Sequence, residues 1–368
     1  MLIDLIAGAR PNFIKISPII NAIKEKQNEG IEINFRLIHT GQHYDKNMSG
    51  SFFDQLNIPS PEHNFEAGGG TQAEQTSKIM VAYEKLLLQK PSHLCLVVGD
   101  VTSTMACAIT AQKMHIPVAH VESGIRSGDW SMPEEINRLV TDAITNYFFT
   151  TTEIANDNLK KSGVNEGRIF FVGNTMIDTL LKHRSSFRKP KVWGELNLQL
   201  KQFIVITLHR PGNVDEEDNL KNIINELVRN SRGIPLVFPV HPRTANKLKS
   251  LGISHPNLYM IEPLSYLEFN YLVERSKAVV TDSGGITEEA TVMHIPCMTI
   301  RDNTERPETI SIGTNELLGT NPKAIQPAMN KLFEGNWKKG GIPELWDGKT
   351  AIRIVDHLLK LNSSLKSS

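Results

Sequence analysis

Short apolar runs rich in Val, Ile and Leu alternate with amphipathic segments along most of the chain. In the first half, the apolar runs predict β-strands at residues 2–7, 33–38, 94–98, 118–121, 147–150 and 169–172. Between several of them, apolar side chains recur at the spacing of helical turns, over residues 15–25, 75–88 and 102–114. This alternation predicts βαβ units, and therefore a parallel sheet with helices on both faces.

The alternation begins again after residues 184–193, a polar segment without clear periodicity that we interpret as a linker. Further strands are predicted at 203–207, 235–239, 258–261, 278–281 and 296–300. We therefore expect an α/β protein with two Rossmann-like, doubly wound domains that face each other across a cleft. The predicted domains span residues 1–183 and 184–350, and a C-terminal helix over 351–368 completes the first. Ligands of such folds bind at the carboxyl ends of strands.

Composition and missing motifs exclude several classes of function. The 40 basic and 40 acidic residues give no net charge, so we expect neither nucleic acid nor a membrane as partner. Cys95, Cys107 and Cys297 lie in apolar stretches without a CxxC pair, which predicts buried free thiols and no zinc site. GxGxxG, HExxH and GxSxG are absent, so we expect no nicotinamide cofactor, no other cofactor and no metal. With no signal peptide or membrane span predicted, we expect a cytoplasmic globular protein.

The segment TDSGGITEE at residues 281–289 directly follows an apolar run and predicts a strand, a tight turn and a helix. Gly284 and Gly285 allow a sharp turn and a close approach to a ligand. The unpaired amides that follow Ser283, together with the helix dipole, favour an anion there. Glu289, about one helical turn further on, is suited to accept hydrogen bonds from sugar hydroxyls. The alternative is an ordinary helix start that is capped by Asp or Ser.

Acidic residues gather at strand ends of the first half. Asp100 lies two residues after one predicted strand, Glu122 directly follows another, and Glu134 lies in the first turn of a helix that begins with Pro133. Arg138, four residues after Glu134, lies on the same helix face and could pair with it. For Asp100 alone, an N-cap of the following helix is the simpler interpretation.

Basic residues occur where the helix dipole does not favour them. Arg10 and Lys15 flank the start of the first helix, where cations are mildly unfavourable, so we interpret them as ligand groups rather than solvated side chains. In the second half, basic residues recur after strands and predict an anion site. They are His209, Arg210, His241, Arg243, Arg301 and Arg306.

Taken together, these segments resemble the non-hydrolysing UDP-N-acetylglucosamine 2-epimerases. In chain order, the resemblance rests on GARP at 8–11 with Lys15, TGQH at 40–43, GD at 99–100, HVESG at 120–124, PEEINR at 133–138, LHR at 208–210, TDSGGI at 281–286 and TERPE at 304–308. The resemblance implies the two-domain fold of the glycosyltransferase B class. It also implies interconversion of UDP-N-acetylglucosamine and UDP-N-acetylmannosamine, in which UDP is eliminated across C1–C2 to leave 2-acetamidoglucal and then re-adds.

The resemblance further implies residue roles. Asp100, Glu122 and Glu134 would be the acid/base groups, with Arg10, Lys15 and Arg138 neutralising charge around them or the leaving phosphate. In the second domain, the diphosphate would be held by His209, Ser283, Gly284 and Gly285. Glu289 would contact the ribose and Arg306 the sugar or the phosphate. Phe269 matches the family's uracil contact, and its alternative is a core aromatic on a helix.

Several alternatives stay open. The chain departs from better-known bacterial members at Asn12, Phe13, Asp45 and Pro211, and we expect weak or absent activation by a second UDP-sugar near Gln42 and His43. The substrate could instead be a 2,3-diacetamido-uronic or 6-deoxy UDP-sugar. Rival classes are a glycosyltransferase of the same fold and a non-catalytic UDP-sugar sensor. A homodimer is expected.

Overall fold

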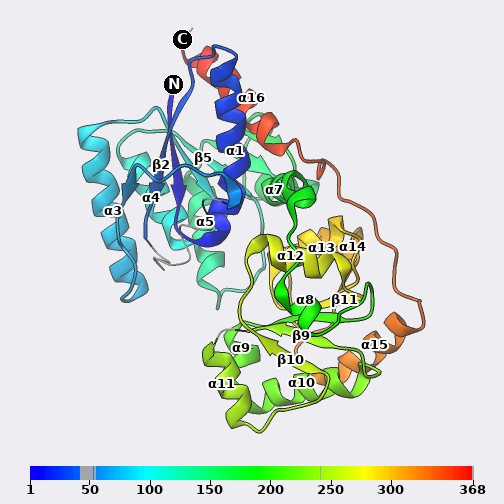
Figure 1. Cartoon of the computed structure of the whole chain (residues 1–368). Coiled ribbons are helices and arrows are strands. Elements are labelled where there is room, and N and C mark those ends of the chain that lie inside the picture. Colours follow the sequence, from blue (N-terminus) through cyan, green and yellow to red (C-terminus); the bar gives the residue numbers. More distant parts are fainter. Residues whose placement is uncertain (42–52, 54, 241, 367–368) are drawn as a thin grey trace. The chain divides into compact units, whose positions relative to one another are not determined.

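The computed structural model describes residues 1–41, 53, 55–240 and 242–366 (Figure 1). The chain forms two compact units, one made of Met1–Lys182 with Glu344–Ser368 and the other of His183–Pro343. Each unit contains one sheet in which all paired strands run parallel. The α/β class with two doubly wound sheets that we expected is confirmed. Among the described residues, no helix is both long and apolar enough to span a membrane.

The sheet of the first unit has the strand order β3-β2-β1-β4-β5-β6-β7. Its strands are β1 (Leu2–Ala7), β2 (Asn34–His39), β3 (His63–Asn64), β4 (Leu94–Val98), β5 (Val118–Val121), β6 (Tyr147–Thr150) and β7 (Ile169–Phe171). The central strands are apolar on both faces because helices cover both, as β4 shows with all of its residues buried. The order reverses between β1 and β4.

The helices of the first unit form two layers. These helices are α1 (Arg10–Asn28), α3 (Gln72–Gln89), α4 (Thr102–Lys113), α5 (Pro133–Ile144), α6 (Glu153–Lys161), α7 (Thr175–His183) and α16 (Thr350–Lys366). Helices α1 and α16 lie side by side, and the Thr179 hydroxyl of α7 donates to the Ile14 carbonyl of α1 (2.6 Å; Figure 1). Right-handed connections place α3, α4 and α5 together on the opposite face.

The chain re-enters the first unit before its last helix. Trp346 donates its indole N–H to the carbonyl of Thr151 (3.2 Å), and the amides of Thr350 and Ala351 donate to Asp178 (3.1 and 2.7 Å). These contacts join residues that lie far apart in sequence, so the last helix belongs to the same core as β1.

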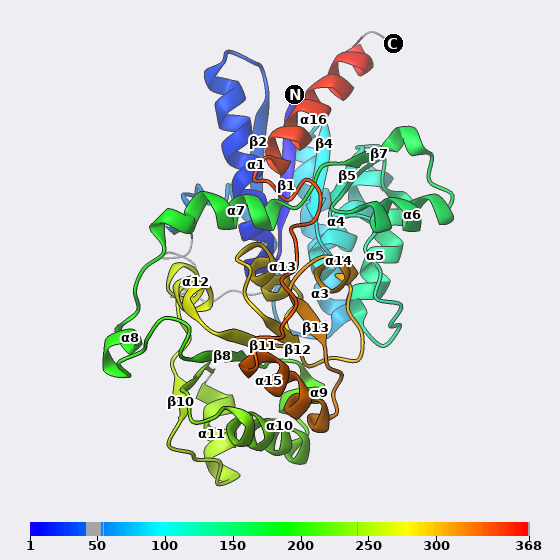
Figure 2. The ribbon, with the colours of Figure 1, turned by 90° about the vertical axis from the view of Figure 1, so that its right-hand side faces the viewer.

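The second unit repeats the scheme with the strand order β10-β9-β8-β11-β12-β13. Its strands are β8 (Ile204–Thr207), β9 (Leu236–Pro239), β10 (Leu258–Ile261), β11 (Ala278–Thr281), β12 (Cys297–Thr299) and β13 (Asn315–Leu317). Its helices are α8 (Lys191–Glu195), α9 (Pro211–Val214), α10 (Glu217–Asn230), α11 (Pro242–Ser250), α12 (Tyr266–Arg275), α13 (Gly284–Val292), α14 (Pro307–Ser311) and α15 (Ile325–Phe333). Helices α10 and α15 pack against each other, as do α13 and α14 (Figure 2). The order reverses between β8 and β11.

The sequence pattern left several elements unnoticed. The segment 184–193, which we interpreted as a linker, begins just after the boundary between the two units. It contains a 3-10 turn (Arg184–Ser186) and the start of α8, where Trp193 packs edge-on against Phe203 (5.7 Å between ring centroids). The pattern also missed β3 and β13. Strand β3 has only two residues, and β13 carries the buried Asn315, whose side chain accepts a hydrogen bond from Thr299 (2.7 Å) in place of apolar packing.

Candidate functional site

In the first unit, β1, β4 and β5 end side by side at one edge of the sheet. Leu5 pairs with Leu96, and Val98 pairs with Val121. Gly99 and Glu122 therefore leave the sheet as neighbours, and the turn after β1 lies beside them. Because the strand order reverses between β1 and β4, this edge is the place where doubly wound sheets bind ligands.

A buried ion pair joins α1 to this edge. Lys15 Nζ lies 2.7 Å from Glu122 Oε2, and both side chains are buried. A Cβ on Gly99 would lie only 3.3 Å from Nζ, so the lysine reaches the end of β4 as well. The interpretation of Lys15 as a solvated surface residue is therefore wrong. Glu122 has φ +67°, a left-handed conformation that costs a non-glycine residue about 1–3 kcal/mol and clusters at functional sites.

Arg138 of α5 connects two carboxylates. Its Nε and Nη2 donate to Asp100 Oδ2 (3.0 and 2.6 Å), and its Nη1 donates to Glu135 Oε2 (2.7 Å). Asn137 donates to the carbonyl of Asp100 (2.8 Å). Helix α4 instead has Val101 at its N-cap, so the N-cap interpretation of Asp100 is wrong. Glu134, the predicted partner of Arg138, is half-buried in the first turn of α5.

Glu135 is a site residue that the sequence analysis did not single out. It accepts hydrogen bonds from the amides of Ser127 and Gly128 (2.9 and 3.1 Å) in addition to Arg138. Burial acts to raise the pKa of Glu135, but these hydrogen bonds outweigh it and leave the pKa below its ordinary value. The helical spacing could have indicated this contact, because Glu135 and Arg138 are three residues apart on the buried face of α5.

A second buried network lies behind Asp100. His120 Nε2 lies 2.8 Å from the carbonyl of Gly99, and Nδ1 lies 2.7 Å from Asp142 Oδ1. Arg126 donates to the other oxygen of Asp142 (2.6 Å). Burial acts to raise the pKa of Asp142, but the hydrogen bonds and charges of His120 and Arg126 outweigh this effect and leave the pKa below its ordinary value. The network ties β5 and α5 to the loop that carries Asp100.

Arg10, the first residue of α1, is half-buried, and desolvation lowers its pKa.

In the second unit, β8 and β11 end together where the strand order reverses. Thr207 pairs with Thr281, so His209 and Ser283 each lie two residues beyond paired positions. Asp282 is fully buried, and its Oδ1 lies 2.7 Å from Nδ1 of His209. Burial acts to raise the pKa of Asp282, but the hydrogen bonds from His209, Asn213 and the Arg210 amide outweigh it and lower the pKa.

The predicted strand, turn and helix are present as β11 and α13, but the capping by Asp or Ser is not. Ser283 is the N-cap, but its side chain makes no capping hydrogen bond, and Asp282 bonds to the segment after β8 instead. Neither Gly284 nor Gly285 has a positive φ, so the expected need for backbone freedom is wrong. The constraint at Gly284 is space, because a Cβ there would lie 2.9 Å from Oε1 of Glu305.

The basic residues of this edge are paired with carboxylates. Arg306 Nε lies 2.9 Å from Glu288 Oε1, and Arg301 Nη2 lies 2.8 Å from Glu305 Oε2. Arg210 lies 3.8 Å from the same Glu305. Burial acts to raise the pKa of Glu305, but the charges of Arg301 and Arg306 lower it to about 2. Gln42, His43, Asp45 and His241 lie outside the described residues, as do the side chains of Pro211 and Arg243.

Glu289 and Phe269 lie on α13 and α12. Glu289 Oε1 accepts hydrogen bonds from the Tyr266 hydroxyl (2.7 Å) and from Asn270 Nδ2 (3.5 Å). Phe269, on the same helix as these two donors, is only half-buried, so it is not a fully buried core aromatic. The hydroxyl of Tyr266, a residue that the sequence analysis did not use, fixes the direction of the Glu289 carboxylate.

Replacing Glu289 by glutamine is expected to stabilise the protein at about pH 8. Burial raises the pKa of Glu289 from 4.5 to about 7, so the folded state favours the protonated acid, and stability falls as pH rises from 4.5 to 7. The raised pKa of Glu289 therefore lowers the free energy of unfolding of the wild type by about 3 kcal/mol above pH 7, and by less than about 1 kcal/mol at pH 5. Urea unfolding at both pH values measures the difference.

The neighbouring Glu288→Gln is the matched control, because it removes the partner of the buried Arg306. We expect this variant to be less stable than the wild type at about pH 8. Equal destabilisation by both substitutions at that pH would contradict the effect assigned to burial of Glu289.

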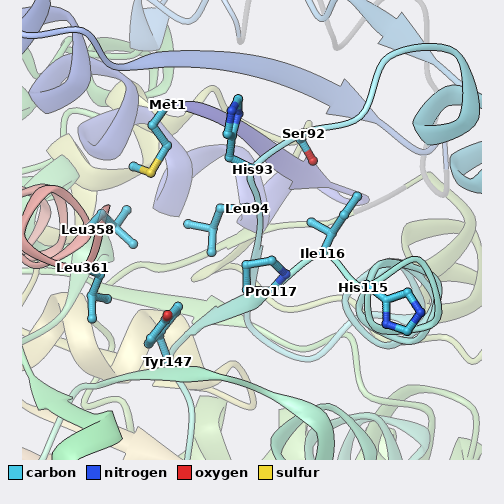
Figure 3. Close-up of a pocket in the computed structure, with 10 residues that line it drawn as sticks. All are labelled: Met1, Ser92, His93, Leu94, His115, Ile116, Pro117, Tyr147, Leu358 and Leu361. Carbon is cyan, nitrogen blue, oxygen red and sulfur yellow. The ribbon is translucent and has the colours of Figure 1, made fainter. Parts of the chain in front are cut away.

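A cavity of about 440 Å³ lies elsewhere in the first unit (Figure 3). It is lined at the starts of β1, β4, β5 and β6 by Met1, Leu94, Pro117 and Tyr147, and on one side by Leu358 and Leu361 of α16. The candidate residues follow the ends of these strands, so this cavity lies at the opposite edge of the sheet. Among the described residues, no group of three or more His, Cys, Asp or Glu side chains is arranged to hold a metal.

Comparison with known proteins identifies the relatives of this chain. The sequence model of a family described as UDP-N-acetylglucosamine 2-epimerase matches residues 24–359. A UDP-N-acetylglucosamine 2-epimerase of Methanocaldococcus jannaschii is 42% identical over 369 residues, which cover 96% of this chain and 98% of that protein. A UDP-2,3-diacetamido-2,3-dideoxy-D-glucuronate 2-epimerase of Pseudomonas aeruginosa is 37% identical over 98% of this chain and all of that one.

A solved structure supports the same family assignment. The crystal structure of the Methanocaldococcus jannaschii UDP-GlcNAc 2-epimerase in complex with UDP-GlcNAc and UDP matches with a TM-score of 0.87 and 40% identity. The match covers 98% of this chain and all of that one, so the similarity extends through both units. The chain belongs to the UDP-N-acetylglucosamine 2-epimerase family.

Proposed function

We propose that this protein interconverts UDP-N-acetylglucosamine and UDP-N-acetylmannosamine by eliminating and re-adding UDP. The observation that carries the proposal is the pair of contacts at one sheet edge, Lys15 with Glu122 and Arg138 with Asp100. Carboxylates brought together at a ligand-binding edge and held by cations suit proton transfer at carbon. Family membership and the 42% identical relative support the same reaction.

The chemistry explains why several carboxylates are needed. A base removes the proton at C2, the C–H electrons form the C1–C2 double bond, and the C1–O bond breaks with its electron pair leaving on UDP. In the return step, UDP oxygen re-adds at C1 and a proton is delivered to the other face of C2. Because the proton leaves one face of C2 and returns to the other, proton-transfer groups are needed on both sides of the sugar. We assign this role to Asp100, Glu122 and Glu134. Lys15 and Arg138 balance the charge of these carboxylates, and Arg10 that of the leaving phosphate.

The second unit supplies the nucleotide contacts in this proposal. His209, Ser283 and the amides at Gly284 and Gly285 bind the diphosphate, because the unpaired amides of the first helical turn favour anions. The other contacts follow the family resemblance: Glu289 binds the ribose hydroxyls, Phe269 stacks on uracil, and Arg306 lies near the sugar or phosphate.

Incubation with UDP-N-acetylglucosamine alone tests the function. An epimerase converts it to a mixture with UDP-N-acetylmannosamine without an acceptor, and NMR of the anomeric protons measures the ratio. A glycosyltransferase leaves the sugar unchanged until an acceptor is added, and a sensor binds it without turnover. Either of these outcomes would contradict the proposal.

A second candidate is the same reaction on a modified UDP-sugar. The 37% identical relative named for a diacetamido-glucuronate favours it. That substrate has a carboxylate at C5 and an amide at C3, so kcat/KM measured for both UDP-sugars decides between the candidates. The expected homodimer and the cytoplasmic location stay predictions.

A further inference from the structure

The Asp282 carboxylate faces the segment that follows β8. Its Oδ2 accepts the amides of His209 (3.0 Å) and Arg210 (2.9 Å) and Nδ2 of Asn213 (3.0 Å). Its Oδ1 lies 2.7 Å from Nδ1 of His209. The carboxylate therefore ties the end of β11 to the loop after β8, although Ser283, the next residue along the chain, begins the turn into α13.

The partners of Asp282 determine which nitrogen of His209 carries a proton. Backbone amides and the Asn213 NH₂ group only donate, so Asp282 must accept from all of them. A carboxylate engaged in this way is an acceptor for the ring as well, and Nδ1 of His209 must be the donor. The His209 side chain is 62% exposed, whereas that of Asp282 is fully buried. The Nδ1 side of the ring is thus held by a buried carboxylate, and its Nε2 side faces solvent.

We infer that Asp282 is a positioning residue for the epimerisation that acts through His209. It holds Nδ1–H and directs Nε2 to the diphosphate of the UDP-sugar, to which Nε2–H donates with the ring doubly protonated in the complex. The inference rests on the proposed function, which assigns His209 to the diphosphate. The register supports it, since Thr207 and Thr281 are paired and both His209 and the α13 amides follow that pair. Without the carboxylate, an exposed imidazole is free to turn and to change tautomer. Outer partners that orient a metal-bound histidine contribute about 10–100-fold to activity, and we expect an effect of the same scale here.

A double-mutant cycle tests the coupling. We expect Asp282→Asn to lower kcat by about 10–100-fold in the wild-type background. In a His209→Gln background, the same substitution should cause little further loss, because the ring it positions is gone. If the fold losses in kcat of the two single variants multiply in the double variant, the inference is overturned. Glu289→Gln is the control, since the Glu289 carboxylate bonds to Tyr266 and Asn270 of α12, and its loss in kcat/KM should multiply with that of His209→Gln.

The wild-type protein provides a test that does not depend on a variant's stability. After ¹⁵N labelling of its 12 histidines, the ring signals of His209 are the ones missing from His209→Gln. We expect a protonated Nδ1 with and without UDP, and a neutral ring protonated only at Nε2 would overturn the inference. A wild type that binds UDP but does not epimerise would instead contradict the proposed function, and the NMR result would still decide the role of Asp282.

Discussion

Replacing Glu122 by glutamine is expected to lower kcat by about 10²-fold or more, the scale of lost acid–base catalysis. Asp100→Asn and Glu134→Gln should have effects of the same size. In each case the amide keeps the shape of the side chain but can no longer take a proton from carbon. Glutamine at position 122 also keeps an oxygen that can accept from Lys15, which lies 2.7 Å from the carboxylate, so the fold should survive.

UDP affinity separates the two units in this prediction. The three carboxylate variants lie in the first unit and should bind UDP as the wild type does, by titration calorimetry. His209→Ala lies in the second unit and should bind UDP more weakly, because it removes a group assigned to the diphosphate. Equal loss of UDP affinity in all four variants would contradict this division of roles.

Arg138→Met is expected to lower the free energy of unfolding by about 3–5 kcal/mol, because it removes one partner of a buried ion pair. The guanidinium contacts Asp100 at 2.6 Å and Glu135 at 2.7 Å, and Glu135 is almost completely buried. Both carboxylates would lose their counter-charge, and kcat should fall as well because Asp100 loses its fixed position. Denaturant unfolding and turnover of the same preparation measure both effects.

Arg229→Met is the matched control for this substitution. Arg229 and Glu226 have the same spacing of three residues and the same 2.7 Å contact as Arg138 and Glu135, but the Arg229 side chain is 72% exposed. An exposed pair of this kind is worth about 0.2–1 kcal/mol. A control that costs as much as Arg138→Met would show that burial does not determine the effect.

The fold was largely predictable because apolar runs between helices specify a parallel sheet. Strands such as β4 and β11 are buried on every residue, and buried residues carry the pattern that sequence periodicity detects. Strand β13 was missed for the opposite reason. Asn315 is buried there through a hydrogen bond to Thr299, and a polar residue gives no apolar signal.

The site was predictable at the level of segments but not of partners. The motifs predicted that Asp100 and Glu122 lie at one edge, because residues that follow parallel strands share it. They did not indicate that Arg138 contacts Glu135, or that Asp282 bonds to the loop after β8 instead of capping α13. Such choices depend on side-chain geometry between elements that are distant in sequence.

Epimerisation in deuterated water tests the central claim most directly. The elimination route breaks the C2–H bond and returns a proton from the site, so the UDP-N-acetylmannosamine formed from UDP-N-acetylglucosamine should carry deuterium at C2, as seen by loss of the C2 proton signal in NMR. A product that retains its original proton at C2 would contradict the elimination mechanism and the acid/base roles of Asp100, Glu122 and Glu134.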